Sequence, residues 1–115
     1  MYVPPAFREE RPEVMAALIA AHPLAMLVTT GAEEPTANLV PMTLDPAAGI
    51  LRAHLARANP QLDELRAAQG SGQPVLAVFQ GPQAYVSPGW YASKAEHGRV
   101  VPTWNFLMVQ ARGVP

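Results

Sequence analysis

The chain contains no cysteine and few charged residues. Without cysteine it cannot form disulfides, bind metals through thiolates or use a cysteine nucleophile, and this fits a reducing cytoplasm. Only 15% of the residues are charged, with eight Lys and Arg against nine Asp and Glu. The formal net charge of -1 gives no general attraction to nucleic acid or to anionic membranes. Any anion site must therefore be local.

The sequence also lacks a long hydrophobic run. Its longest apolar stretch, around residues 24–28, is far shorter than the ~20 residues that cross a bilayer. Residues 1–13 carry prolines and charges, unlike a signal peptide, so we expect neither membrane insertion nor secretion. Half of the residues are nevertheless hydrophobic, which suits one compact domain over residues 1–115. So little charge favours covering part of the surface in a homodimer.

Local signatures of catalysis are missing too. The sequence has no GxSxG, no HExxH, no Gly-rich phosphate loop and no Rossmann fingerprint. His22, His54 and His97 are far apart along the chain, so we expect no metal site, and each is expected to be either structural or a single hydrogen-bonding group. No helix-turn-helix with a basic second helix is present, because the second predicted helix carries two acids against one arginine. Direct DNA recognition is not predicted.

Turn residues divide the chain into short elements. Pro12 and the apolar spacing of Val14, Ala17, Leu18 and Ala21 predict a helix over residues 12–21. The other predicted elements are strands at 24–30, 36–44 and 50–55, a turn at Gly31, Glu33, Glu34 and Pro35, a helix from Asn59 and Pro60 to about Gly70, a hairpin of 74–79 with 84–87 that turns at Gly81 and Pro82, and a strand at about 101–111.

This order predicts a mainly β fold, an antiparallel β-barrel with peripheral short helices. The chain stops at Pro115, where a barrel would need further strands, so we expect a barrel that is truncated at its C-terminus.

The junction between the third strand and the second helix is a candidate phosphate pocket. Arg52 and His54 lie two residues apart, hence on one strand face, and Arg57 and Asn59 lead into the helix. A helix N-terminus offers amide N–H groups, and a guanidinium can bind phosphate oxygens through two hydrogen bonds. Exposed arginines beside a capping asparagine explain the same residues equally well.

Two further stretches combine aromatic and polar side chains. Residues 80–94 include Tyr85, Trp90, Ser93 and Lys94, which suit a flat cofactor with a charged tail, or else an aromatic loop in a dimer core. In the second stretch, 101–106, Trp104 lies on the opposite strand face from Thr103 and Asn105. Ordinary strand packing accounts for this second pattern as well.

Several stretches taken together resemble a known family. They are Met1-Tyr2-Val3-Pro4 with Phe7, residues 24–30 and 54–60, Phe79-Gln80-Gly81-Pro82, Tyr85-Val86-Ser87-Pro88, Trp90-Tyr91, residues 93–98 and Val101-Pro102-Thr103-Trp104-Asn105. The sequence is similar to the PaiB-like family, FMN-binding negative transcriptional regulators, along nearly its whole length. The segment from Tyr85 to Asn105 is the most specific part of the match.

The resemblance implies a split β-barrel like that of pyridoxamine-phosphate oxidases and flavin reductases. FMN would lie at a homodimer interface, with its phosphate near residues 52–59 and with Ser93, Lys94, Trp104 and Asn105 lining the flavin site or the interface. Phe106 stands where the family commonly has tyrosine, which removes one hydroxyl. Three functions stay open: a flavin-binding regulatory module, an FMN-dependent oxidoreductase without an identifiable substrate, and a dimeric scaffold without flavin.

Overall fold

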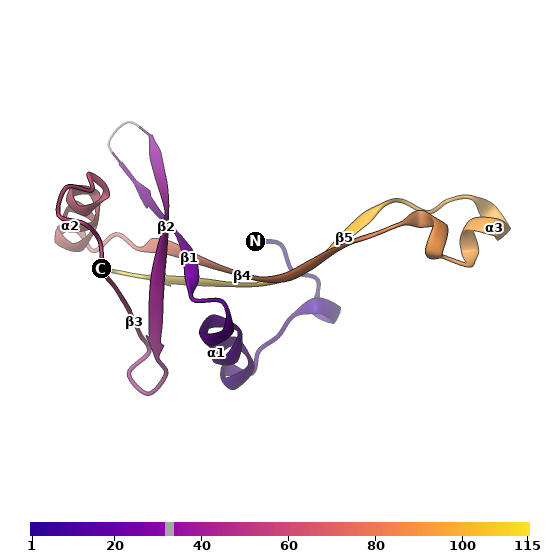
Figure 1. The fold of residues 1–115 in the computed structure, drawn as a ribbon, viewed down its shortest axis with the longest axis horizontal. Helices are drawn as coiled ribbons and strands as arrows, with labels where there is room; N and C mark the ends of the chain where they lie inside the picture. The colour runs from indigo at the N-terminus through magenta and orange to yellow at the C-terminus, as the bar shows by residue number, and fades with distance from the viewer. Residues whose placement is uncertain (32–33) are drawn as a thin grey trace.

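A computed structural model describes residues 1–31 and 34–115 of the chain (Figure 1). In chain order its elements are η1 (Pro5–Phe7), α1 (Pro12–Ala21), β1 (Leu24–Thr30), β2 (Pro35–Asp45), β3 (Ile50–Ala53), α2 (Gln61–Ser71), β4 (Val75–Val86), η2 (Pro88–Trp90), α3 (Ser93–His97) and β5 (Thr103–Gly113). The five strands form one antiparallel sheet in the order β3-β2-β1-β4-β5. The predicted mainly β, antiparallel architecture is confirmed. The sheet is consistent with a split-barrel-like fold, but it is not closed.

The first half of the chain follows its sequence signals closely. α1 and β1 have the predicted bounds, and β2 pairs with β1 from Leu24↔Pro41 to Thr30↔Pro35 as a hairpin. Of the predicted turn between them, Glu33 lies outside the described residues. β3 ends at Ala53 and α2 begins at Gln61, so the predicted strand was too long by two residues and the helix starts one residue later.

The predicted hairpin at Gly81 and Pro82 is wrong. β4 runs on as one strand, and it pairs with β5 on both sides of an irregularity between Gln80 and Gln83. Gln80 pairs with Met108 and Gln83 pairs with Phe106, so β4 has one more residue than β5 between these pairs, which is a β-bulge. Proline has no N–H to give to a strand ladder, and a bulge tolerates this. At Gly81 a Cβ would lie 3.2 Å from Leu18 Cδ1, so glycine permits this close contact.

The segment between β4 and β5 contains α3, a short helix that is not among the elements predicted from the sequence. The helix has only five residues and no side-chain cap. It ends at Gly98, whose φ of 66° is left-handed and suits glycine. β5 then begins at Thr103, two residues later than predicted.

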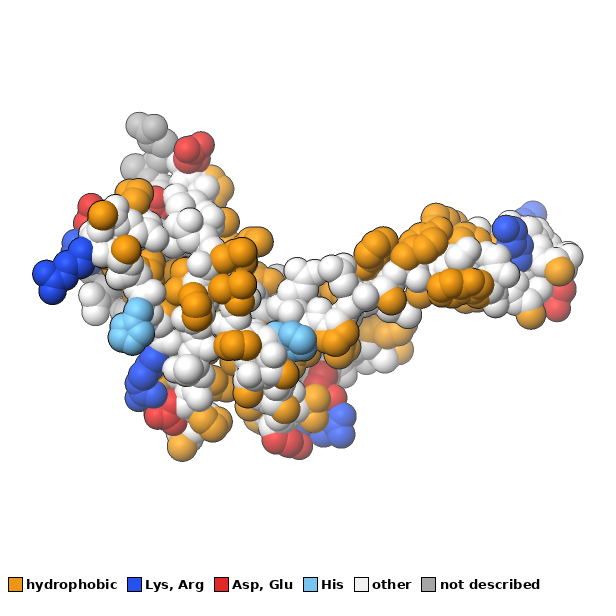
Figure 2. All heavy atoms as spheres, viewed as in Figure 1, with side chains coloured by type: hydrophobic (Ala, Val, Ile, Leu, Met, Phe, Trp, Pro, Cys, Tyr) orange, Lys and Arg blue, Asp and Glu red, His pale blue; other side chains and the backbone are white. Residues whose placement is uncertain are grey.

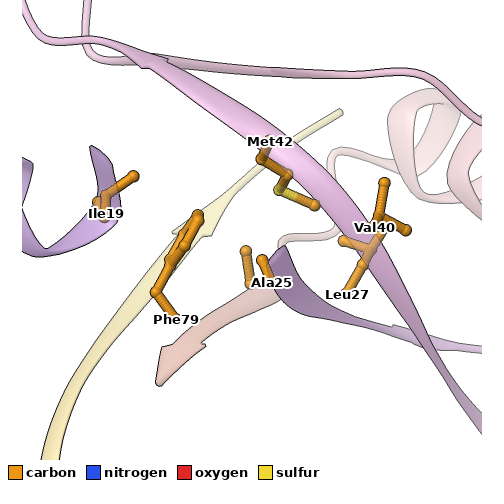
Figure 3. Close-up of a cluster of buried hydrophobic side chains, with 7 residues drawn as sticks. Ile19, Ala25, Leu27, Val40, Met42 and Phe79 are labelled. Carbon is orange, nitrogen blue, oxygen red and sulfur yellow. The ribbon is translucent and has the colours of Figure 1, made fainter. Parts of the chain in front are cut away.

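One face of the sheet carries the hydrophobic core, and we call it the inner face (Figure 3). Successive strand residues alternate between faces, so Ala25 and Leu27 of β1 point to the inner face, as does Phe79 of β4. The full buried cluster is Ile19, Ala25, Leu27, Val40, Met42, Ala77 and Phe79. Ile19 belongs to α1, which therefore packs on this face.

The outer half of β4 and the first half of β5 leave the rest of the molecule as a long projection (Figure 1). We call residues 80–108 the arm, and the remaining described residues the body. The radius of gyration is 18.1 Å, against about 13 Å for a compact chain of this length. None of the arm residues is buried. A compact fold of this single chain would not have such a shape.

None of the helices within residues 1–31 and 34–115 combines the length and the apolar character needed to cross a bilayer.

Candidate functional site

Arg52 is fixed on the β2–β3 hairpin by a carboxylate. Its Nη1 lies 3.1 Å from Asp45 Oδ2, and Asp45 Oδ1 accepts the N–H of Ala48 at the turn. The Ala48 amide, followed by the Arg52 guanidinium, holds the pKa of Asp45 below its usual value. Arg52 therefore has one partner already, although its side chain is 59% exposed.

His54, Arg57 and Asn59 lie in the connection between β3 and α2, which we call the corner. His54 and Arg57 are exposed, and no described carboxylate forms an ion pair with Arg57. Arg52 precedes the corner directly along the chain. Two guanidinium groups and an imidazole are thus offered to solvent at one end of the body, and this donor set fits a phosphate.

The amide groups at the start of α2 are not open donors. Asn59 Oδ1 accepts the N–H of Gln61 at 3.0 Å, and the Asn59 carbonyl accepts that of Leu62. The N–H of Asp63 is donated to the Pro60 carbonyl at 3.1 Å. A phosphate at the corner would therefore meet side chains, or it would have to displace the Asn59 side chain from its amide.

A buried polar network lies beneath α2, and its central residues, Gln61 and Glu64, are not among the predicted site residues. Gln61 is fully buried, and its Nε2 donates to the Leu27 carbonyl at 3.0 Å and to Thr29 Oγ1 at 3.1 Å. Its Oε1 accepts from Asn38 Nδ2 at 3.1 Å. Strand alternation was the available signal, because it places Thr29 and Asn38 on the same face as Leu27 and so demands polar partners there.

Glu64 completes this network one helical turn after Gln61. Thr29 Oγ1 donates to Glu64 Oε2, and Thr36 Oγ1 donates to Oε1 at 2.7 Å. These hydrogen bonds, that from Thr29 first, hold the pKa of Glu64 below its usual value. The network attaches α2, and with it the corner, to the β1–β2 hairpin.

Ser93 and Lys94 lie at the tip of the arm, in α3. Lys94 lines an open hollow of about 610 Å³ together with Trp90 and Tyr91. The structure therefore places the predicted lysine beside aromatic rings, as a flat anionic ligand would require.

Trp104 and Asn105 are consecutive residues of β5, opposite Tyr85 and Ala84, and alternation along a strand places them on opposite sides. Trp104 Nε1 donates to Gln83 Oε1 at 2.7 Å, and its ring lies 5.8 Å from that of Tyr85. A second groove of about 330 Å³ runs along this side of the arm. Its lining residues are Gln80, Gln83, Trp104, Phe106 and Met108.

The structure does not bring the two groups of predicted site residues together within one chain. α2 and the adjoining corner lie at one end of the molecule, and α3 lies at the other (Figure 1). The longest principal extent is 58 Å. Arg52, His54, Arg57 and Asn59 thus form one group, and Ser93, Lys94, Trp104 and Asn105 form another on the arm.

Comparison with known proteins identifies the relatives of this chain. It is 34% identical over 139 aligned positions to the uncharacterized protein AN0679 of Emericella nidulans, covering 98% of this chain and 55% of that protein. It is 30% identical to the protease synthase and sporulation protein PAI 2 of Bacillus subtilis, over 98% of this chain and 51% of that protein.

A third relative, the uncharacterized protein YKL070W of Saccharomyces cerevisiae, is 40% identical over 56% of this chain and 36% of its own length. The chain thus spans about half the length of the first two relatives. A family model described as "putative FMN-binding domain" matches residues 1–115. The chain therefore belongs to this family of putative FMN-binding domains.

Proposed function

We propose that this chain binds FMN in a site shared by two copies and acts as a flavin-dependent regulatory module in the cytoplasm. The single observation that carries the shared site is the separation of the two groups of candidate residues within one chain. A homodimer in which one arm reaches the corner of the other chain would unite them. The family match supports FMN as the ligand.

In this proposal the corner holds the phosphate. Arg57, without an ion-pair partner among the described residues, is the main donor, and Arg52 and His54 assist it. Asn59 holds the start of α2 in place, and the partner's arm supplies Lys94 and the aromatic surface around Trp104 for the flat ring. Bound FMN would supply redox chemistry, while the protein supplies position and electrostatics.

The regulatory role is supported by the similarity to the PaiB-like family and by the B. subtilis relative, whose name connects that protein with protease synthesis and sporulation. In this role the flavin, or its redox state, changes the association of the two copies. The dimer dissociation constant should therefore differ between oxidised and reduced FMN in sedimentation experiments. NAD(P)H-driven turnover of the flavin would instead favour an oxidoreductase, and a protein that neither carries nor binds flavin would be a scaffold.

A mixing experiment tests the shared site. Arg57→Ala should weaken FMN binding by ~1–3 kcal/mol, the usual loss for a charge-assisted hydrogen bond, and Lys94→Ala should also weaken it. Arg8→Ala removes an exposed arginine outside the site and serves as the control. When the two defective variants are mixed and exchange subunits, about a quarter of the sites should regain wild-type affinity in a symmetric dimer. No recovery would mean that both groups do not belong to one shared site.

A further inference from the structure

The corner presents Arg57 on a tight turn that is closed by a backbone hydrogen bond. The N–H of Asn59 donates to the Ala56 carbonyl at 2.9 Å, so Arg57 is a central residue of a four-residue turn. Leu55, just before this turn, packs against the hydrophobic core. On its other side the turn leads into α2. The exposed arginine is thus carried by a backbone that is held at both ends.

Asn59 joins this turn to the start of α2. Its Oδ1 accepts the N–H of Gln61 at 3.0 Å, and its carbonyl accepts the N–H of Leu62 at 3.0 Å. Together with the hydrogen bond to Ala56, these contacts connect the turn with the first residues of the helix. The position of the Arg57 turn therefore depends on where the first residue of α2 lies.

Gln61 is that first residue, and its side chain attaches it to the sheet. The side chain is fully buried, and its amide donates to the Leu27 carbonyl and to Thr29 Oγ1 on β1. It also accepts from Asn38 Nδ2 on β2. Three hydrogen bonds to two strands define a position more narrowly than apolar packing, which an aliphatic side chain of similar size would provide. The start of α2 therefore has a defined place on β1 and β2.

The side chains that depend on this connection lie at the surface. Figure 2 shows Arg or Lys and His side chains at the end of the body where β3 and α2 lie. Arg57 and His54 are exposed there. Ordering a long exposed side chain costs conformational entropy, and ordering its backbone as well would cost more. A turn that is already fixed leaves only the side chain to be ordered when an anion binds.

We infer that Gln61 is a positioning residue for the phosphate end of the ligand, which it does not touch and on which it acts through Asn59 and the Arg57 turn. This inference rests on the proposed function, in which the corner holds the phosphate. Among the described residues, the hydrogen bonds of Gln61 lead to β1, β2 and Asn59 and not to the arm. Gln61 therefore serves recognition of the phosphate and not of the flat ring.

A comparison of FMN with riboflavin, which lacks the phosphate, separates these two parts in fluorescence titrations. Gln61→Leu should weaken FMN binding by about 10-fold or more, the scale on which residues behind the direct ligands act in other sites, and should leave riboflavin binding unchanged. Asn38→Ala removes one partner of Gln61 and should act in the same direction to a smaller degree, which keeps the test decisive if Gln61→Leu does not fold.

A control variant separates positioning from stability. Ile19→Val removes one methyl group from the core on α1 and should lower stability without changing the ratio of the FMN and riboflavin affinities. If Gln61→Leu weakened both ligands equally, or left the FMN affinity unchanged, the inference would be overturned.

Hydrogen exchange of the flavin-free chain tests the connection without a ligand. In Gln61→Leu the amide of Asn59 should exchange faster than in wild type, because opening of the Arg57 turn is coupled to the start of α2. The amide of Gly49, which donates to the Asp45 carbonyl in the β2–β3 turn, is the internal control and should not change.

Two results of the exchange experiment would count against the connection. Unchanged exchange at Asn59, or equal acceleration at Gly49, would overturn it. Faster exchange at Asn59 alone, in a chain whose wild type binds neither FMN nor riboflavin, would refute the proposed function and leave the coupling between Gln61 and the Arg57 turn standing.

Discussion

The body and the arm contain parts of the same two strands, yet different forces hold them. In the body, β4 and β5 pack their inner residues against β1 and α1, and Phe79 is fully buried. In the arm the same strands continue as a two-stranded ribbon without a buried residue. Isolated ribbons of this kind are marginal in water. The comparison shows that backbone pairing extends the arm, but side-chain packing stabilises only the body.

The most direct test of whether packing stabilises only the body is to replace one phenylalanine in each region with alanine. Phe79→Ala should lower the free energy of unfolding by ~3–5 kcal/mol, the cost of a cavity in a packed core. Phe106→Ala, at a position that is 49% exposed, should cost less than about 1 kcal/mol in the monomer. Urea denaturation at low protein concentration measures both. Equal losses would show that the arm has a core of its own.

A smaller effect is expected from the polar network beneath α2. Gln61→Leu removes an amide that donates to the Leu27 carbonyl and to Thr29 Oγ1 and accepts from Asn38 Nδ2, so each of these groups loses one hydrogen bond. Stability should fall by ~1–3 kcal/mol. The exposed Gln69 of the same helix is the matched control, and Gln69→Leu should change stability little. A Gln61→Leu protein as stable as wild type would mean that the network is not a structural attachment.

Glu64 should make part of the body's stability depend on pH. Because its pKa in the fold is lower than the ordinary value of 4.5, its contribution is complete above that value. It is lost as the pH falls through the lower pKa of the folded state. The melting temperatures of wild type and Glu64→Gln should differ less at pH 3 than at pH 7. Because both proteins contain Asp45, the change in this difference with pH reports on Glu64 alone. Curves that remain equally far apart would contradict the assignment.

The smallest effect is expected at the hydrogen bond within the arm. Trp104→Phe removes the Nε1 donor to Gln83 and keeps an aromatic ring beside Tyr85. Because the bond is exposed, the monomer should lose less than about 0.5 kcal/mol. Thermal melting followed by circular dichroism would measure this change. A larger loss of stability would mean that Trp104 makes a stabilising contact beyond those described in this single chain.

Much of the body could be predicted from its sequence, because local signals there agree with the final packing. Pro12 and Pro23 delimit α1, and a run of β-forming residues that ends at Gly31 delimits β1. In the arm the local signal misled: Gly81 and Pro82 are typical of a turn, but β5 offers β4 a partner on both sides of them. Because β4 and β5 are far apart in sequence, a local sequence pattern cannot predict that they pair.

The candidate site was predictable only in part, for a similar reason. Strand alternation predicts opposite sides for Trp104 and Asn105, and only Trp104 lines the groove of the arm, while Arg52 on β3 lies opposite Thr43. The separation of the corner from the arm tip depends on how far β4 and β5 extend, which only the fold shows. The hydrogen bond from the Gln61 N–H to Asn59 Oδ1 agrees with the capping asparagine that the sequence predicts, although α2 begins at Gln61 and not at Pro60.

The single extra residue in β4 has a consequence for sequence change. Before it, even-numbered positions such as Val78 and Gln80 face outward, and after it odd-numbered positions such as Gln83 and Tyr85 do. Deleting Pro82 would remove the extra residue, so Gln83 and Tyr85 would follow Gln80 in plain alternation and would still pair with Phe106 and Trp104. In this molecule the loss of one codon at the bulge would thus make the strand ladder of the arm regular and leave the facing side chains, and the core of the body, as they are.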